Sequence, residues 1–71
     1  MQRIPVISSC LRSVGFDESS VTLEIEFIDG GIYQYSRVPD KVHASLMSAA
    51  SKGSYFDRNI RKAGYPCKKI L

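Results

Sequence analysis

The chain lacks tryptophan altogether, and its 71 residues include one histidine and two cysteines. These three residues, His43, Cys10 and Cys67, are widely scattered. A structural zinc site needs about four cysteine or histidine ligands at short paired spacings, so we expect no metal site. A glycine-rich phosphate loop is missing too, because Gly30-Gly31 resembles a hairpin turn and no helix follows at the needed distance. We therefore expect no cofactor.

Long apolar runs are absent as well. No segment approaches the roughly 20 apolar residues of a membrane helix. Arg3 and Pro5 interrupt the stretch where a signal peptide would need its apolar core. We therefore expect a cytoplasmic protein without membrane contact. In a reducing compartment Cys10 and Cys67 would be free thiols, although the sequence leaves open a bridge that ties the two ends together.

The single histidine also limits catalysis. A thiol or hydroxyl nucleophile needs a base within hydrogen-bond reach. Asp40 lies three residues before His43, so the residues of a candidate catalytic set are present in the sequence: Cys10, His43 and Asp40. Nothing in the sequence places Cys10 near His43. We interpret His43 as a half-exposed helical residue and expect that the protein is not an enzyme.

The composition is that of an ordinary folded domain, with 44% hydrophobic and 24% charged residues. The length suits one domain, and no repeat or linker divides the chain. We expect residues 1–71 to form a single domain, with residues 1–9 as a lead-in and residues 65–71 as a basic tail.

Three segments predict β-strands, at residues 10–16, 21–28 and 32–37. The clearest is 21–28, where apolar and polar residues alternate with period two. Its apolar face consists of Val21, Leu23, Ile25 and Phe27. Asp29-Gly30-Gly31 follows it and has the composition of a hairpin turn.

Two segments predict helices, at residues 39–52 and 54–63. Gly53 suits the left-handed residue that ends a helix. Ser54 suits the N-cap of the second helix, which Gly64 and Pro66 would terminate. The predicted fold class is α+β in the order β-β-β-α-α, a three-stranded antiparallel meander with both helices packed on one face.

Several motifs together resemble the KTSC domain, over roughly residues 8–65. They are Val14-Gly15-Phe16-Asp17, the hairpin pattern Phe27-x-x-Gly30-x-x-Tyr33-x-Tyr35, Val38-Pro39, Leu46, Ala49, and the run from Ser51 to Phe56. That domain occurs at the C-terminus of some lysyl-tRNA synthetases and as free-standing bacterial and phage proteins. The resemblance implies the fold and suggests RNA binding. It supplies no catalytic residue.

The family is marked by a central Tyr-x-Tyr, here Tyr33-Gln34-Tyr35. Two aromatic rings on one face of a strand could stack RNA bases. The alternative is that they are packing residues, and the hairpin register bears on this choice. A two-residue loop would place both tyrosines beside Glu26 and Glu24, whereas a three-residue loop would place them on the main apolar face. We favour the three-residue loop, with Phe27 opposite Tyr33 and Ile25 opposite Tyr35, and therefore packing.

Charge is distributed unevenly along the chain. Residues 1–51 carry four cationic and six acidic side chains, a net charge of −2. Residues 52–71 carry six cationic side chains and one acid, Asp57, a net charge of +5. We call these six the C-terminal basic surface: Lys52, Arg58, Arg61, Lys62, Lys68 and Lys69.

Cations at this spacing could bind phosphates, or they could simply form a solvated helix face and tail. The functional hypothesis is a small non-enzymatic binding module that contacts RNA through the C-terminal basic surface. The alternative is a module that binds a protein partner through a sheet edge or an apolar patch, such as Tyr55 with Ile70 and Leu71.

Overall fold

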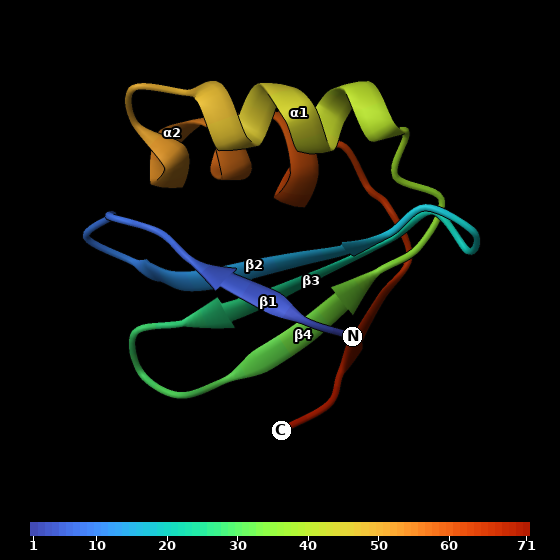
Figure 1. Cartoon of the computed structure of the whole chain (residues 1–71), viewed down its shortest axis with the longest axis horizontal. Coiled ribbons are helices and arrows are strands. Elements are labelled where there is room, and N and C mark those ends of the chain that lie inside the picture. The colour runs from blue at the N-terminus through green and yellow to red at the C-terminus, as the bar shows by residue number, and fades with distance from the viewer.

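Five antiparallel strands form one sheet in the order of the sequence, and the computed structural model describes all 71 residues (Figure 1). The strands are β1 (Arg3–Pro5), β2 (Leu11–Asp17), β3 (Thr22–Phe27), β4 (Ile32–Tyr35) and β5 (Cys67–Lys69). The helices are α1 (Asp40–Ser48) and α2 (Lys52–Phe56), and α2 continues into a single π-helical turn, η1 (Asp57–Arg61).

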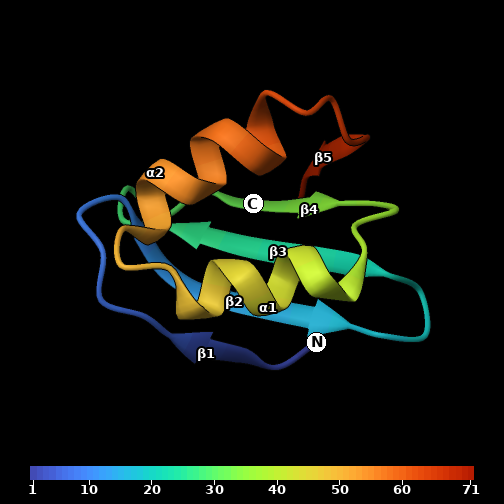
Figure 2. The ribbon, with the colours of Figure 1, turned by 90° about the horizontal axis from the view of Figure 1, so that it is seen from above.

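Both helices cover the same face of the sheet, which leaves the other face open (Figures 1 and 2). The core therefore lies between two layers, as the α+β prediction requires. Its fully buried side chains come from both layers: Leu11, Val14, Leu23, Ile25, Val38, Leu46 and Ile60. The period-two pattern predicted this inner face of β3 correctly.

The number of strands was predicted wrongly, because the sheet has five strands and not three. The residues expected as a lead-in contain β1, which pairs with β2. The residues expected as a tail contain β5, which pairs with β4. Each of these edge strands has only three residues, too few to show an alternating pattern. Pro5 and the two lysines of β5 are typical of sheet edges, where they hinder further strand pairing.

The β3–β4 hairpin has a three-residue loop, but the loop is not the predicted one. Phe27 N donates to Gly31 O at 2.8 Å, so the loop consists of residues 28–30. Gly30 has a φ of 99°, which explains a glycine at its last position. Ile25 consequently faces Tyr33, not Tyr35. The predicted register was wrong by two residues, but a shift of two keeps every side chain on its predicted face.

The boundary between the helices also differs from the prediction. The first helix ends at Ser48, and Ser51 caps the second by accepting a hydrogen bond from Ser54 N at 3.3 Å. Gly53 lies inside α2, so it does not end a helix, and Ser54 is not the cap. The reason for a glycine here is a close contact, since a Cβ on Gly53 would lie 2.5 Å from Cys10 Sγ. Gly64 has a φ of 84° and follows the second helix as predicted.

Val21 does not belong to the apolar strand face, because β3 begins at Thr22. It lies in the turn with a φ of 46° and is 39% exposed. A β-branched residue is strained in the left-handed region. Its carbonyl oxygen accepts a hydrogen bond from Val38 N at 2.9 Å, which helps to hold this conformation.

We expect Val21→Asn to raise the free energy of unfolding by about 0.5–1 kcal/mol, because asparagine tolerates this backbone conformation better than valine. Urea unfolding followed by circular dichroism measures the change. Ile28→Asn is the matched control, since Ile28 is exposed in the other turn without a positive φ. An equal effect of both substitutions would show that Val21 is not strained.

Candidate functional site

The two tyrosines point toward the helices and are packed to different extents. Tyr35 is 6% exposed, and the centroid of its ring lies 5.5 Å from that of Phe56 in an edge-to-face arrangement. Burial raises the pKa of the Tyr35 hydroxyl. Tyr33 is half-buried against Phe27, at 5.6 Å between centroids, with Lys69 Nζ 5.9 Å from its ring centroid. Tyr35 thus offers no free ring face in this conformation.

Three members of the C-terminal basic surface already have a hydrogen-bond or ion-pair partner within the chain. Lys52 Nζ donates to Ala49 O at 3.1 Å. Arg61 and Lys62 both pair with Asp57, which η1 places one turn before them. The hydrogen bond from Arg61, with a further one from Lys62, holds the pKa of the half-buried Asp57 carboxyl below its usual value.

The remaining members have no ion pair. Arg58 is exposed on η1, and Lys68 and Lys69 are exposed on β5. Lys69 lies on the helix side of the sheet opposite Tyr33, whereas Lys68 lies on the open side opposite Gln34. Tyr35 on β4 is paired with Cys67 on β5, and the helical segment that continues from α2 runs along this side of the sheet (Figure 2). The structure therefore brings η1 and β5 to the same edge of the sheet.

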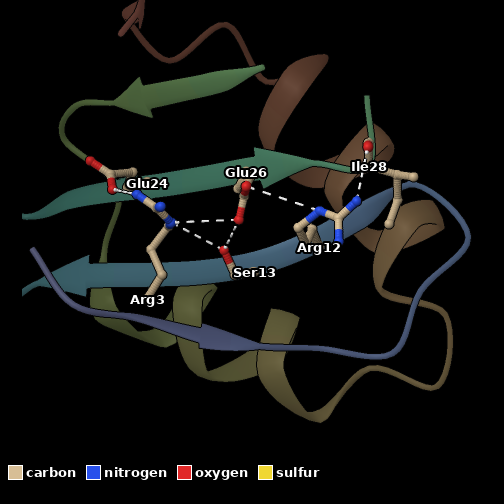
Figure 3. Close-up of polar contacts among 6 residues, drawn as sticks. All are labelled: Arg3, Arg12, Ser13, Glu24, Glu26 and Ile28. Atoms are coloured by element: carbon tan, nitrogen blue, oxygen red, sulfur yellow. Dashed lines mark hydrogen bonds and ion pairs between the residues drawn. The ribbon is translucent and has the colours of Figure 1, made fainter. Parts of the chain in front are cut away.

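The open face of the sheet carries a network of charged groups that the sequence analysis did not identify (Figure 3). Arg3 reaches from β1 across β2, where its Nη1 donates to Glu24 Oε2 at 2.5 Å and its Nε to Ser13 Oγ at 3.1 Å. Ser13 Oγ donates to Glu26 Oε1 at 2.8 Å. Arg12 approaches Glu26 from the other end of β2, at 4.0 Å between Nε and Oε2.

Glycine at position 15 makes this reach achievable. Arg3 is paired with Gly15, which is paired in turn with Glu24, so the three residues form one row across the sheet. A Cβ on Gly15 would lie 2.8 Å from Gln2 O and 3.1 Å from Arg3 Cγ. The missing side chain thus lets β1 lie close to β2 and lets Arg3 pass over it.

Glu24 is 6% exposed despite lying on the open face. Burial alone would raise the pKa of its carboxyl, but hydrogen bonds from Gln34 and Arg3 outweigh burial and hold the pKa below its ordinary value. The carboxylate is therefore ionised in the folded protein and ties β1, β3 and β4 together. Its surroundings indicate a structural role.

The molecule has one cavity, an open cleft of about 310 Å³ between the β2–β3 turn and the start of α1. Its lining residues are Phe16, Glu18, Asp40, His43 and Ala44. The rings of Phe16 and His43 stack with 4.6 Å between centroids and 9° between planes. Burial lowers the pKa of His43, against the opposing charges of Asp40 and Glu18.

The structure does not assemble the set of Cys10, His43 and Asp40. Cys10 directly precedes β2 and its thiol packs on Gly53, whereas His43 stacks on Phe16 six residues further along. Six residues of strand span roughly 20 Å. Both cysteines are exposed free thiols. No group of three or more metal-ligating side chains comes together, and none of the helices has the length and apolar character to cross a membrane.

Comparison with known proteins identifies the family. The family model of the KTSC domain matches residues 7–65. The chain belongs to the KTSC domain family. A crystal structure of a KTSC domain protein from Yersinia pestis has a TM-score of 0.93 and 47% identity, and covers 99% of this chain and 97% of its own.

Two further relatives show the domain alone and inside a larger protein. A protein of Stutzerimonas stutzeri is 38% identical over 65 residues, which are 92% of each chain. A lysine–tRNA ligase of Nostoc punctiforme is 36% identical over 53 residues, which are 75% of this chain. The chain thus matches only 9% of the length of that ligase.

The residues matched by the KTSC model comprise the three central strands and both helices. They also include the whole lining of the cleft and the cations of η1. The two edge strands, with Arg3, Lys68 and Lys69, lie outside the residues matched by the family model, whereas the Yersinia pestis structure covers 99% of this chain.

Proposed function

We propose that this KTSC domain is a non-enzymatic RNA-binding module, cytoplasmic like the translation machinery it would serve, and that its RNA contact is the C-terminal basic surface. The observation that carries the proposal is the joint contribution of α2, η1 and β5, which supply five cations, while a sixth, Lys62, directly follows η1; the single acid among them is Asp57. The similarity to a lysine–tRNA ligase supports RNA as the anion, because that relative acts on a tRNA.

Binding of this kind is mainly electrostatic. Cations that neutralise phosphates release condensed counterions, so affinity falls as salt rises. Arg58, Lys68 and Lys69 have no ion pair to give up, whereas Arg61 and Lys62 would have to exchange Asp57 for a phosphate. We therefore expect Arg58 and Lys69 to contribute more than Arg61 and Lys62. Phosphate contacts of this type position a nucleic acid without reading its sequence.

We expect Arg58→Ala/Lys69→Ala to weaken binding to a bulk tRNA mixture and to reduce the slope of log affinity against log salt by about 1.5–2. Fluorescence anisotropy at several salt concentrations measures both quantities. The matched control is Arg37→Ala/Lys41→Ala, which removes the same charge from exposed residues outside the basic surface.

Two results would contradict the proposal. One is the absence of wild-type binding at low salt. The other is an equal loss in Arg58→Ala/Lys69→Ala and in the control, which would indicate a response to net charge and not to a defined surface. Both variants should keep the stability of the wild type within about 0.5 kcal/mol, because the altered side chains are exposed.

A further inference from the structure

We propose that the cleft between the β2–β3 turn and α1 binds the guanidinium group of an arginine side chain presented by a protein partner. The cleft is the one cavity of the molecule, and it uses none of the residues of the C-terminal basic surface. A concave site with a few convergent polar groups is the ordinary form of a ligand site.

Two of the residues that line the cleft, Phe16 and His43, have aromatic rings. Phe16 comes from the end of β2 and His43 from the second turn of α1, and their rings are nearly parallel. Burial lowers the pKa of His43, so its imidazole is neutral at pH 7 and adds no positive charge to the cleft. Because the two rings stack on each other, each leaves only its outer face for a ligand, and such an uncharged ring face suits a planar cation.

The other contribution is negative charge on carboxylates that have no hydrogen-bond or ion-pair partner in the molecule. Five of the seven acidic side chains have a hydrogen-bond or ion-pair partner. Glu18 and Asp40 are the two that have none, and both line the cleft. Asp40 also interacts favourably with the N-terminus of α1. That interaction cannot account for Glu18, which comes from a different segment.

Hydrogen bonds within the chain hold the turn that carries Glu18 in place without a ligand. The Asp17 carboxylate accepts hydrogen bonds from Ser19 N at 3.1 Å, Ser19 Oγ at 2.8 Å and Ser20 Oγ at 2.9 Å. The hydrogen bond between Val38 N and Val21 O joins this turn to the segment that leads into α1. Both sides of the cleft are therefore fixed relative to each other, which lowers the entropic cost of binding.

The chemistry of the lining selects among cations. A metal ion would need a set of ligating side chains that the molecule does not assemble. A guanidinium matches both features of the cleft, because it stacks on rings and donates in its plane to carboxylates, whereas an ammonium is a compact point charge. None of the five lining residues is cationic at neutral pH, so none could hold the α-carboxylate of free arginine. This favours an arginine within a polypeptide.

The test uses two short peptides, acetyl-Gly-Arg-Gly-amide and its citrulline counterpart, which has the same shape without the charge. Each is titrated into the ¹⁵N-labelled protein in the absence of RNA, and amide chemical shifts are followed by NMR. We expect the arginine peptide to shift the resonances of the β2–β3 turn and the first turns of α1, with a Kd of about 1 mM or weaker. Free arginine and a lysine peptide should bind more weakly.

The decisive variant is Glu18→Gln, which leaves α1 untouched. We expect it to weaken binding of the arginine peptide about two- to fivefold, the range that corresponds to the loss of one exposed ion pair. Asp29→Asn is the control, because it removes one carboxylate from the other turn, and it should leave the affinity unchanged. Equal binding of the two peptides, equal losses in the two variants, or shifts located elsewhere would overturn the proposal. None of these outcomes depends on whether the basic surface binds RNA.

Discussion

Phe56→Ala is expected to lower the free energy of unfolding by about 3–5 kcal/mol, the cost of deleting a buried aromatic ring. Phe56 is 4% exposed and stands at the centre of an aromatic group that joins both layers. Its ring centroid lies 5.4 Å from that of Phe27 and 5.5 Å from that of Tyr35, with edge-to-face geometry in both pairs. The substitution removes both contacts and leaves a cavity.

The effect is large relative to the whole molecule. At roughly 0.05–0.15 kcal/mol per residue, a domain of this length has a total stability of about 4–11 kcal/mol. Urea unfolding at 25 °C measures the loss. Tyr55→Ala is the control, because the adjacent Tyr55 is only half-buried and should cost less than half as much. Equal losses at the two positions would mean that Phe56 is not the residue that joins the helix to the sheet.

The inner face of the sheet could be predicted from the sequence because alternation has a physical cause. Successive side chains on a strand point to opposite faces of the sheet, so the alternation of apolar and polar residues in β3 reveals its orientation. The residue that each strand residue pairs with is harder to predict than the face it occupies. Registers that differ by two residues place identical faces inside, and only loop geometry distinguishes them. This is why both tyrosines were assigned to the correct face but opposite the wrong neighbours.

The edge strands could not be predicted for a related reason. Strands β1 and β5 are held by backbone hydrogen bonds to β2 and β4, and these bonds do not depend on side-chain type. Only one side chain that anchors an edge strand could have been noticed in the sequence. It is Arg3 of β1, which pairs with the buried Glu24. The pairing of Arg3 with Glu24 could not be predicted, because it depends on the strand register that places Arg3, Gly15 and Glu24 in one row across the sheet.

At Gly53 the sequence rule for helix ends gave a wrong prediction, because the glycine is in contact with a residue far away in the sequence. A glycine between two helical segments is usually the left-handed residue at a helix end. Here the glycine lies inside α2 against the Cys10 thiol, which occupies the space that a Cβ would take, and the first helix ends four residues earlier at its C-cap, Ala49. The contact joins residues more than forty positions apart, so no window of sequence could have indicated it.

The two candidate sites, the C-terminal basic surface and the cleft, also differ in how far they could be predicted from the sequence. The cations of the basic surface follow one another along the chain, so their excess could be counted directly. The cleft combines a turn with a helix that are separated by two strands. Sequence analysis could relate Asp40 to His43 by helical spacing, but only the packing of α1 over the end of β2 brings Phe16 and Glu18 to them.

The second large effect concerns Glu24 on the open face of the sheet. We expect Glu24→Gln to lower the free energy of unfolding at pH 7 by about 1–3 kcal/mol. The substitution keeps the size of the side chain but removes the charge that Arg3 faces at 2.5 Å. It also removes one carboxylate oxygen and so changes the acceptor available to Gln34. Because Arg3 is partly exposed, water compensates some of the loss.

The pH dependence of this stability difference distinguishes an effect of the Glu24 charge from an effect of side-chain packing. The folded protein holds the pKa of Glu24 below its ordinary value of 4.5, so its contribution is fully present above pH 4.5 and declines as the pH falls through the lower folded value. The difference between wild type and Glu24→Gln should therefore be largest at pH 7 and should shrink by pH 3. Asp17 and Asp57 also have lowered pKa values, but both proteins contain them and their contributions cancel in the comparison. Urea unfolding at pH 7, 5 and 3 measures the difference, and a value that is zero at pH 7 or constant across the range would show that the carboxylate does not anchor β1.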